Sequence, residues 1–296
     1  MMTATILEIH RSALDDGPGV RTSVFLKGCS LHCSWCHNPE SQKHAPELLV
    51  RRDNCIGCGR CKNICPNELL RNGVKELDRD QCTACGVCSE VCPSGTLSIA
   101  GKSMTAQEVM QVVSLDIGHY HATGGGITLT GGEPLYQADF SYELLSLAQA
   151  ENIHTCVETS GVGKPNAIKA LQSVTNLWLF DIKGPPDVYK QMVGAPFATV
   201  KSNLVYLLKQ QAKVILRCPI ITGITDNDQW IDQLCELIRE MNVVYPLQGA
   251  ELLPFHRLGL DKYTAVGRKA PMASVYPPDA GAIKFWEEKL QQTADK

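Results

Sequence analysis

The sequence lacks several features that would place it in common classes. It has no run of about 18 apolar residues, the length that a membrane-spanning helix needs. Its first residues, MMTATILEIHRSALDDGPG, lack the apolar stretch followed by small residues that is typical of a signal peptide. Basic residues are not in excess, because 28 Lys and Arg oppose 31 Asp and Glu for a net charge of −3. We therefore expect a cytoplasmic protein that uses neither membrane nor nucleic acid as a partner.

Cysteine is the residue that the sequence has in excess. Eleven of the 14 cysteines lie between Cys29 and Cys92. Such clustering does not resemble a disulfide framework spread through a secreted fold, and it indicates thiolates that hold metal. Cys156, Cys218 and Cys235 have no cysteine neighbours in the sequence, so we expect them to be buried structural residues.

An internal repeat lies within the cysteine-rich segment. Residues 55–66 read CIGCGRCKNICP and residues 82–93 read CTACGVCSEVCP. In two-cluster bacterial ferredoxins with the pattern C-x2-C-x2-C-x3-C-P, the fourth cysteine of each run ligates the other [4Fe–4S] cluster. The pattern predicts one cluster on Cys55, Cys58, Cys61 and Cys92, and a second on Cys65, Cys82, Cys85 and Cys88. A zinc ribbon is the alternative, although two sets of four thiols exceed what one zinc ion needs.

A different cysteine motif precedes the repeat. Cys29, Cys33 and Cys36 form C-x3-C-x2-C, which could ligate three irons of a [4Fe–4S] cube and leave the fourth iron without a protein ligand. An open coordination position is typical of a metal centre that binds its substrate. The alternative is a zinc ion held by these cysteines together with His32 or His37.

Outside this segment, short apolar runs alternate with helical segments, which predicts an α/β fold with parallel strands. The expected strands are Ser23–Leu26, Ile127–Thr130, Thr155–Glu158, Leu177–Ile182, Val214–Pro219 and Glu251–Pro254. Helices are expected after a capping box at 105–108 and near 138–151, 164–173, 199–211, 227–241 and 279–291.

Polar or glycine-rich groups follow these strands at their carboxyl ends, which favours a barrel over an open doubly wound sheet. Six units predict a partial (β/α)6 barrel of the TIM type with an inserted ferredoxin-like domain that carries two [4Fe–4S] clusters. We divide the chain into the start of the core (residues 1–50), the insert (51–100) and the remainder of the core (101–296).

The motifs resemble those of a known family. C-x3-C-x2-C with an aromatic residue before its last cysteine resembles the radical S-adenosylmethionine (SAM) superfamily. Within it, the chain resembles the activating enzymes of glycyl radical enzymes, of the longer type that has a ferredoxin-like insert. The resemblance rests on DDGPGVRT from Asp15, FLKGC from Phe25, WCHNPES from Trp35, GGG at 124–126, ITLTGGEP at 127–134, VETSG at 157–161, DIK at 181–183 and LLPFH at 252–256.

The resemblance implies an activity and its partners. One electron would cleave SAM to methionine and a 5′-deoxyadenosyl radical, which removes a hydrogen atom from a glycine Cα of a partner glycyl radical enzyme. It implies three [4Fe–4S] clusters, a flavodoxin or ferredoxin-type electron donor and a monomeric chain. Two other functions are considered: a radical SAM enzyme that modifies peptides, as sulfatase-maturing enzymes do, and an electron-transfer protein without catalysis.

The resemblance also assigns roles to individual residues. The catalytic set is Cys29, Cys33, Cys36, Lys183 and His256. The SAM-binding set is Trp35, Cys36, His37, Gly131, Gly132, Glu133, Asp181, Ile182, Lys183, Arg217 and His256. Glu158 and Asp181 are candidate ligands of a monovalent cation, and Asp16 is expected to contact the glycine-bearing loop of the partner. A structural ion pair is the alternative for Lys183 and for Arg217, and turn chemistry is the alternative for Asp16.

Overall fold

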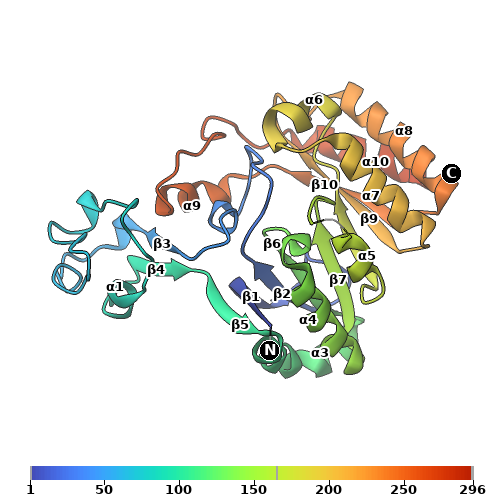
Figure 1. Cartoon of the computed structure of the whole chain (residues 1–296). Helices are drawn as coiled ribbons and strands as arrows, with labels where there is room; N and C mark the ends of the chain where they lie inside the picture. Colours follow the sequence, from blue (N-terminus) through green and yellow to red (C-terminus); the bar gives the residue numbers. More distant parts are fainter. Residues whose placement is uncertain (1, 165, 295–296) are drawn as a thin grey trace.

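The structure is a computed structural model that describes residues 2–164 and 166–294. Its main sheet has eight strands in the order β10-β9-β8-β7-β6-β2-β1-β5 (Figure 1). The parallel strands are β2 (Arg21–Leu26), β6 (Gly126–Gly131), β7 (His154–Thr159), β8 (Leu177–Asp181), β9 (Val214–Ile220) and β10 (Gly249–Pro254). The predicted α/β fold with parallel strands is confirmed, and each expected strand is present.

The order of the parallel strands follows their order in the chain. A doubly wound sheet reverses its strand order at a switch point, whereas the described parallel strands run without reversal from β2 to β10. This is the winding of a barrel. At the β2 side the sheet continues antiparallel into β1 (Thr3–Ala13) and β5 (Lys102–Thr105), so β10 and β5 form its two edges.

The two faces of the sheet have different environments, because successive side chains of a strand point to opposite sides. On β8, Trp178 and Phe180 belong to the large core, which also contains residues of the crossover helices. Leu177 and Leu179 face the other side and form a small separate cluster with Cys156. Strands buried on both faces read as continuous apolar runs, as LWLF at 177–180 does.

The structure has a helix at each place where the sequence predicts one. The helices that follow β5 are α2 (Ala106–Val113), α3 (Ile117–Thr123), α4 (Ala138–Ala150), α5 (Ala167–Gln172), α6 (Pro186–Val188), α7 (Phe197–Lys209), α8 (Asp228–Val244), α9 (Leu260–Ala265) and α10 (Ala280–Ala294). Of these, α3, α6 and α9 were not predicted from the sequence. The capping box at Thr105 and Glu108 is present at the start of α2. Residue 165, within the helix expected near 164–173, lies outside the described residues. In the described chain, no helix is long and apolar enough to cross a membrane.

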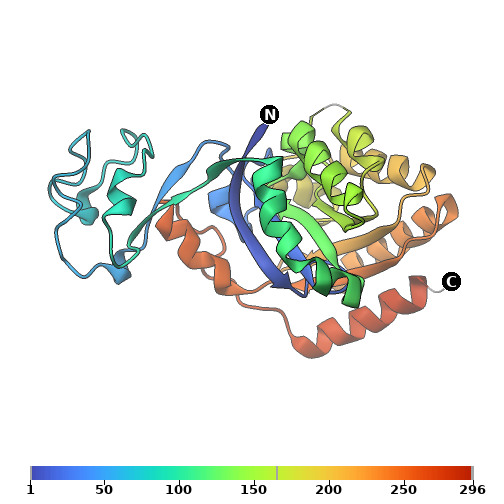
Figure 2. The same cartoon turned by 90° about the horizontal axis from the view of Figure 1, so that it is seen from below.

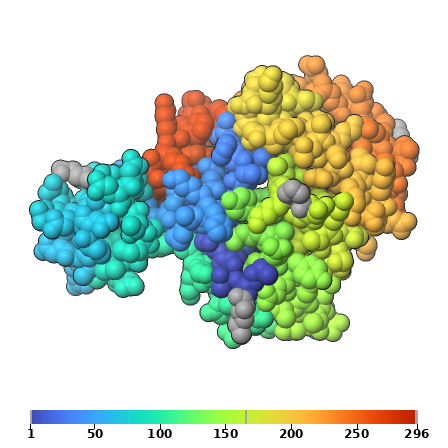
Figure 3. All heavy atoms as spheres, in the orientation of Figure 1, coloured from blue at the N-terminus to red at the C-terminus, as the bar shows by residue number. Residues whose placement is uncertain are grey.

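The cysteine repeat lies in a small lobe that projects from the core (Figures 1, 2 and 3). Its base is a two-stranded antiparallel sheet of β3 (Glu47–Val50) and β4 (Leu97–Ala100). Between these strands the chain forms only short elements, the 3-10 turns Arg52–Asn54 and Val74–Glu76 and helix α1 (Val87–Glu90). The lobe has its own small core, which includes Leu48, Val50, Leu70, Val74, Cys88 and Leu97.

The base of the lobe is held to the core by charged side chains. Arg79 donates to the carbonyl oxygens of Leu48 and of Ala265 at the end of α9, both at 2.7 Å. Glu47 accepts from the buried Lys27 Nζ at 2.9 Å and from Arg268 at 2.6 Å. The Glu47–Ala100 end of the two-stranded sheet is therefore the end next to the core.

Candidate active site

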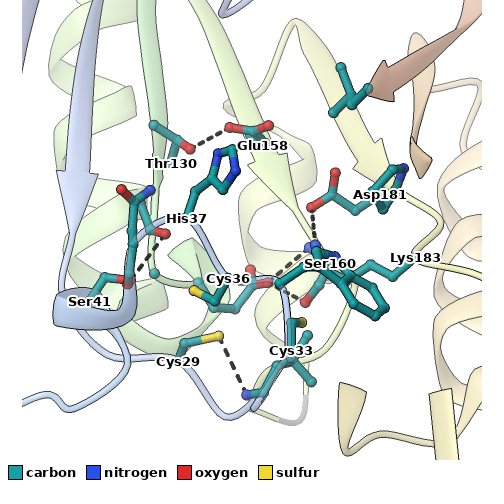
Figure 4. Close-up of a pocket in the computed structure, with 18 of the residues that line it drawn as sticks. Cys29, Cys33, Cys36, His37, Ser41, Thr130, Glu158, Ser160, Asp181 and Lys183 are labelled. Atoms are coloured by element: carbon teal, nitrogen blue, oxygen red, sulfur yellow. Dashed lines mark hydrogen bonds and ion pairs between the residues drawn. The ribbon is translucent and has the colours of Figure 1, made fainter. Parts of the chain in front are cut away.

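A cavity of about 440 Å³ lies at the carboxyl ends of the parallel strands (Figure 4). It brings together residues from the loop after β2, the ends of β6, β7, β8 and β10, and the segment after β10. Among the residues predicted from the sequence, those that line it are Cys29, Cys33, Trp35, Cys36, His37, Gly131, Gly132, Glu133, Glu158, Asp181, Lys183 and His256. Ile182, Arg217 and Asp16 are not among the lining residues.

The loop with the three cysteines is fixed by its backbone. Gly28 and Cys29 donate their backbone N–H groups to the carbonyls of Ser41 and Gln42 at 2.6 and 3.0 Å. On the other side, the N–H groups of His32 and Ser34 bond to carbonyls of the π-helical segment Tyr189–Val193, each at 3.0 Å. Backbone bonds on both sides place the loop independently of its side chains.

Burial dominates the chemistry of the three thiols. It raises the pKa of Cys29 to about 12 and the pKa of Cys36 to about 11. The pKa of Cys33 is also raised by burial, although the nearby Lys183 ammonium opposes the shift. Thiols in such surroundings become thiolates only beside a compensating positive charge, as metal ligands do.

Glu133 lies at the centre of a buried hydrogen-bond network. One carboxylate oxygen accepts from Thr159 Oγ1 at 2.6 Å and from the Leu135 N–H at 3.1 Å. The other accepts from the Ser160 N–H at 2.9 Å and from Ser160 Oγ at 2.5 Å. Burial raises the pKa of Glu133, and these four donors oppose that shift. The network joins the segment after β6 to the end of β7.

Asp181 and Lys183 form an ion pair at the end of β8. The Lys183 Nζ to Asp181 Oδ2 distance is 2.8 Å, and both side chains are largely buried. The Asp181 carboxylate holds the pKa of Lys183 well above its usual range, although burial opposes this. Ile182, between them, points away into the main core and is fully buried. The ammonium and carboxylate thus face the cavity, whereas the intervening side chain stabilises the fold.

Arg217 of β9 is engaged in ion pairs. It donates to Glu158 and to Glu251, each at 3.0 Å, and to the carbonyl oxygen of Asp15 at 2.5 Å. Glu158 also accepts from Thr130 Oγ1, and its carboxylate lines the cavity (Figure 4). Arg217 itself lines a second, more open hollow of about 950 Å³ beside β10. This arrangement corresponds to the buried ion pair considered as the alternative for Arg217.

Two histidines close one side of the cavity. The rings of His37 and His256 lie 3.8 Å apart between centroids, and His37 Nε2 is 3.0 Å from the His256 carbonyl oxygen. Burial lowers the pKa of both imidazoles, and for His37 the neighbouring ring contributes as well. Both side chains are therefore favoured in their neutral form, which can accept as well as donate a hydrogen bond.

Asp16 lies within the turn Asp15–Gly19, outside the cavity lining. Its carboxylate accepts a hydrogen bond from Ser23 Oγ, and its carbonyl oxygen accepts from Thr128 Oγ1 at 2.7 Å. Burial raises the pKa of this carboxyl, with Ser23 opposing. Asp16 is thus tied to strands β2 and β6, on the side of the sheet where Arg217 also lies.

The cysteines of the projecting lobe line two small cavities. One is lined by Cys55, Cys58, Cys61 and Cys92, and the other by Cys65, Cys82, Cys85 and Cys88. The fourth cysteine of each run thus faces the cavity of the other run. No three Cys, His, Asp or Glu side chains of the described chain are placed to hold a single metal ion. The four thiols of each set surround a cavity instead of converging on one point.

Several site residues escape sequence reasoning. Thr159 and Ser160 fix Glu133, yet in the sequence they are two hydroxyl residues after a strand. Of their motif, VETSG at 157–161, only Glu158 is assigned a role from the sequence. The Tyr189 hydroxyl accepts a hydrogen bond from the backbone N–H of Lys183 at 3.0 Å. Tyr189 lies in the π-helical segment Tyr189–Val193, whose sequence has no pattern that would mark it as part of a site. A run of hydroxyl residues directly after a buried strand is the one signal that could have indicated the first two.

Comparison with known proteins agrees with this geometry. Residues 23–238 match the radical SAM superfamily. The chain is 39% identical over 278 residues to the benzylsuccinate synthase activating enzyme of Thauera aromatica, covering 90% of this chain and 83% of that protein. It is 38% identical to the isethionate sulfite-lyase activating enzyme of Desulfovibrio desulfuricans, covering 98% and 93%.

A solved structure supports the fold. The radical SAM methyltransferase from Sphaerobacter thermophilus superposes with a TM-score of 0.52 at 16% identity, covering 98% of this chain and 74% of that one. The relatives favour an activating enzyme over a peptide-modifying enzyme or a simple electron carrier. The chain belongs to the radical SAM superfamily and, within it, to the activating enzymes of glycyl radical enzymes.

Proposed function

We propose that this chain activates a partner glycyl radical enzyme by reductive cleavage of SAM. When bound, the cluster and SAM supply a 5′-deoxyadenosyl radical that abstracts hydrogen from a glycine Cα of the partner. The observation that carries the proposal is the shared cavity. It is lined by the three cysteines, residues 131–133, the Asp181–Lys183 pair and His256, which come from four separate parts of the chain.

The donor set fits a [4Fe–4S] cluster with one open iron. Cys29, Cys33 and Cys36 line the cavity, and no fourth cysteine of the described chain does. A zinc ion would need a fourth ligand, but His32 is not among the lining residues and His37 Nε2 faces the His256 carbonyl. These contacts support the cluster over the zinc alternative.

The polar residues of the cavity fit the ends of SAM. We propose that Gly131 and Gly132 allow the methionyl amino group to approach the backbone, and that Glu133 attracts it by charge while its oxygens stay bound to Thr159 and Ser160. Trp35, His37 and His256 would contact the remaining parts of SAM, and Lys183 would bind a carboxylate. Ile182 would act through its backbone, because its side chain is in the core.

The ion pairs modify two of the expected roles. Arg217 already binds Glu158 and Glu251, so we propose that it acts on SAM through the position of Glu158. Glu158 and Asp181 remain the candidate ligands of a monovalent cation. However, each already has a protein cation, Arg217 or Lys183, which supplies the positive charge that an ion would bring.

In the projecting lobe, the two cysteine-lined cavities support two further [4Fe–4S] clusters with the crossed ligand sets. We propose that this ferredoxin-like insert, residues 51–100, relays electrons from a flavodoxin or ferredoxin-type donor to the cavity of the partial barrel. We propose a monomeric, cytoplasmic chain whose Asp16 contacts the glycine-bearing loop of the partner. Ser23 holds that carboxylate in place.

The proposal is tested by anaerobic reconstitution followed by an assay of SAM cleavage. The wild type should release 5′-deoxyadenosine and methionine with dithionite as reductant, and should contain about twelve irons per chain. Lys183→Met keeps the length of the side chain but removes its charge, so it should weaken SAM binding without loss of iron. If the iron content and the SAM cleavage activity were unaffected by replacement of Cys29, Cys33 or Cys36, the proposed catalytic site would be refuted.

A further inference from the structure

The two cysteine-lined cavities of the lobe lie at different distances from the core. The cavity of Cys65, Cys82, Cys85 and Cys88 is also lined by Leu48 and Ile99, which pair with each other near the core end of the two-stranded sheet. The cavity of Cys55, Cys58, Cys61 and Cys92 is lined by Leu97, which pairs with Val50 at the far end. We call the first the proximal cavity and the second the distal cavity.

The proximal cavity is connected to the catalytic cavity by packed side chains. Arg79 lies close to Cys82 and bonds to the carbonyl of Ala265 at the end of α9. Tyr263, on the same helix, is buried against the wall formed by Trp35 and Cys36. Helix α9 therefore contacts both the lobe and the cysteine loop, whereas the distal cavity lies on the outer side of the lobe.

The distal cavity is also the more accessible of the two. Cys55 and Cys58 are exposed, and none of its four cysteines is buried. In the proximal set only Cys85 is exposed and Cys88 is buried. Ile56, next to Cys55, lines the distal cavity and is 68% exposed.

The charges around the two cavities differ in sign. Residues 51–62 contain four basic residues, all exposed, against one acidic residue: Arg51, Arg52, Arg60 and Lys62 against Asp53. In residues 78–90, which contain three of the four proximal cysteines, the balance reverses, with Asp78, Asp80 and Glu90 against Arg79. None of the ion pairs within the described part of the chain includes Arg52, Arg60 or Lys62. Their charge is available to an outside partner.

We propose that the distal cavity and its basic rim form the docking surface for an acidic one-electron carrier protein. This inference rests on the proposed function, since it needs clusters in the lobe. One electron leaves the reduced donor, which is thereby oxidised by one electron, and the distal site is reduced by one. The electron then passes to the proximal site and on to the catalytic cluster, and no bond or proton moves in these steps.

The test compares a variant of the rim with a charge-matched control in the reconstituted holoenzyme. Arg52→Glu with Lys62→Glu reverses two rim charges without touching a residue that lines either cavity. Lys209→Glu with Lys284→Glu makes the same change in net charge on exposed positions of α7 and α10. The probe is a reduced ferredoxin of low isoelectric point, mixed anaerobically without SAM while cluster bleaching is followed by stopped flow.

The rim variant should be reduced by ferredoxin about tenfold more slowly than wild type at low salt, with the difference shrinking as salt rises. Its affinity for oxidised ferredoxin, measured by anaerobic calorimetry, should fall in parallel. Reduction by dithionite and dithionite-driven SAM cleavage should not change. The charge-matched control should behave as wild type in all four measurements.

Three results would overturn the inference. The first is ferredoxin reduction of the rim variant within about twofold of the control. The second is unchanged reduction of the catalytic cluster in Cys58→Ala, which would mean that the donor bypasses the distal site. The third is salt-dependent binding of an oligonucleotide to the rim with ferredoxin kinetics unaffected. Loss of dithionite-driven SAM cleavage in the wild type would instead refute the proposed function, so the two failures are distinguishable.

Discussion

Ser160→Ala tests the role of the hydrogen bonds that hold Glu133. The substitution removes one of the four donors to a fully buried carboxylate and leaves the Ser160 N–H in place. A hydrogen bond to a charged group contributes about 1.5–3 kcal/mol to stability. For a domain of this size, each kcal/mol corresponds to about 2–4 °C in the melting temperature.

Ser141→Ala is the matched control. Ser141 is equally buried, and its hydroxyl donates to the neutral carbonyl of Pro134 at 3.0 Å. Loss of such a bond costs about 0.5–1.5 kcal/mol, so the Ser160 variant should lose roughly twice as much stability. In a Glu133→Gln background the extra cost of Ser160→Ala should disappear, because the acceptor is then neutral.

The pH dependence distinguishes a charged acceptor from a neutral one. Burial already raises the pKa of Glu133 in the folded state, and loss of a donor raises it further. An acid with a raised folded pKa loses stability as the pH rises from its unfolded pKa to its folded pKa. The destabilisation of the variant relative to the wild type should therefore be larger at about pH 8 than at about pH 6.

Anaerobic scanning fluorimetry of the holoenzyme at both pH values measures these shifts. The reasoning would be refuted if Ser160→Ala lowered the melting temperature no more than Ser141→Ala does. It would also be refuted if the decrease caused by Ser160→Ala became larger as the pH falls.

Three further predictions follow from other parts of the structure. Cys58→Ala or Cys85→Ala should lower the iron content by about four irons per chain. Turnover with a protein electron donor should slow, while SAM cleavage driven by dithionite persists. Iron analysis and SAM-cleavage assays with each of the two reductants measure these effects. Glu158 and Asp181 are already paired with Arg217 and Lys183. Replacing K⁺ and Na⁺ by tetramethylammonium should therefore change the rate of SAM cleavage by less than about twofold. A strict requirement for K⁺ would contradict this. Lys27→Met removes the buried one of the three cations on Glu47 and leaves Arg268 and the exposed Lys43, so the apparent unfolding free energy should fall by about 1.5–3 kcal/mol. An unchanged melting temperature would show that the two remaining cations suffice.

The sequence is informative wherever spacing alone determines chemistry. The crossed pairing of the cysteine repeat could be predicted because C-x2-C-x2-C-x3-C-P is the pattern of two-cluster ferredoxins, in which the fourth cysteine of each run ligates the other cluster. The capping box at Thr105 and the parallel strands were found because their patterns are local. The three-cysteine loop was found for the same reason, and the cavity places it beside Glu133 and Lys183.

What the sequence does not reveal depends on contacts between distant segments. Thr159 and Ser160 become partners of Glu133 only because β6 and β7 are neighbours in the sheet. The role of Arg217 depends on which carboxylates lie within hydrogen-bond distance of its guanidinium group, and in the structure these are Glu158 and Glu251. Such choices are made by packing, which leaves no periodic pattern in the chain.

The most direct test of the account is an electron paramagnetic resonance measurement on an anaerobic mixture of this protein, SAM, dithionite and its partner enzyme. The partner is sought as a large chain with a glycine-radical loop near its carboxyl end, encoded beside this one. The account predicts a glycyl radical doublet with the wild type, formed together with 5′-deoxyadenosine, and no doublet with Cys33→Ala. A glycyl radical that still forms with Cys33→Ala, or SAM cleavage by the wild type that never yields one, would contradict it.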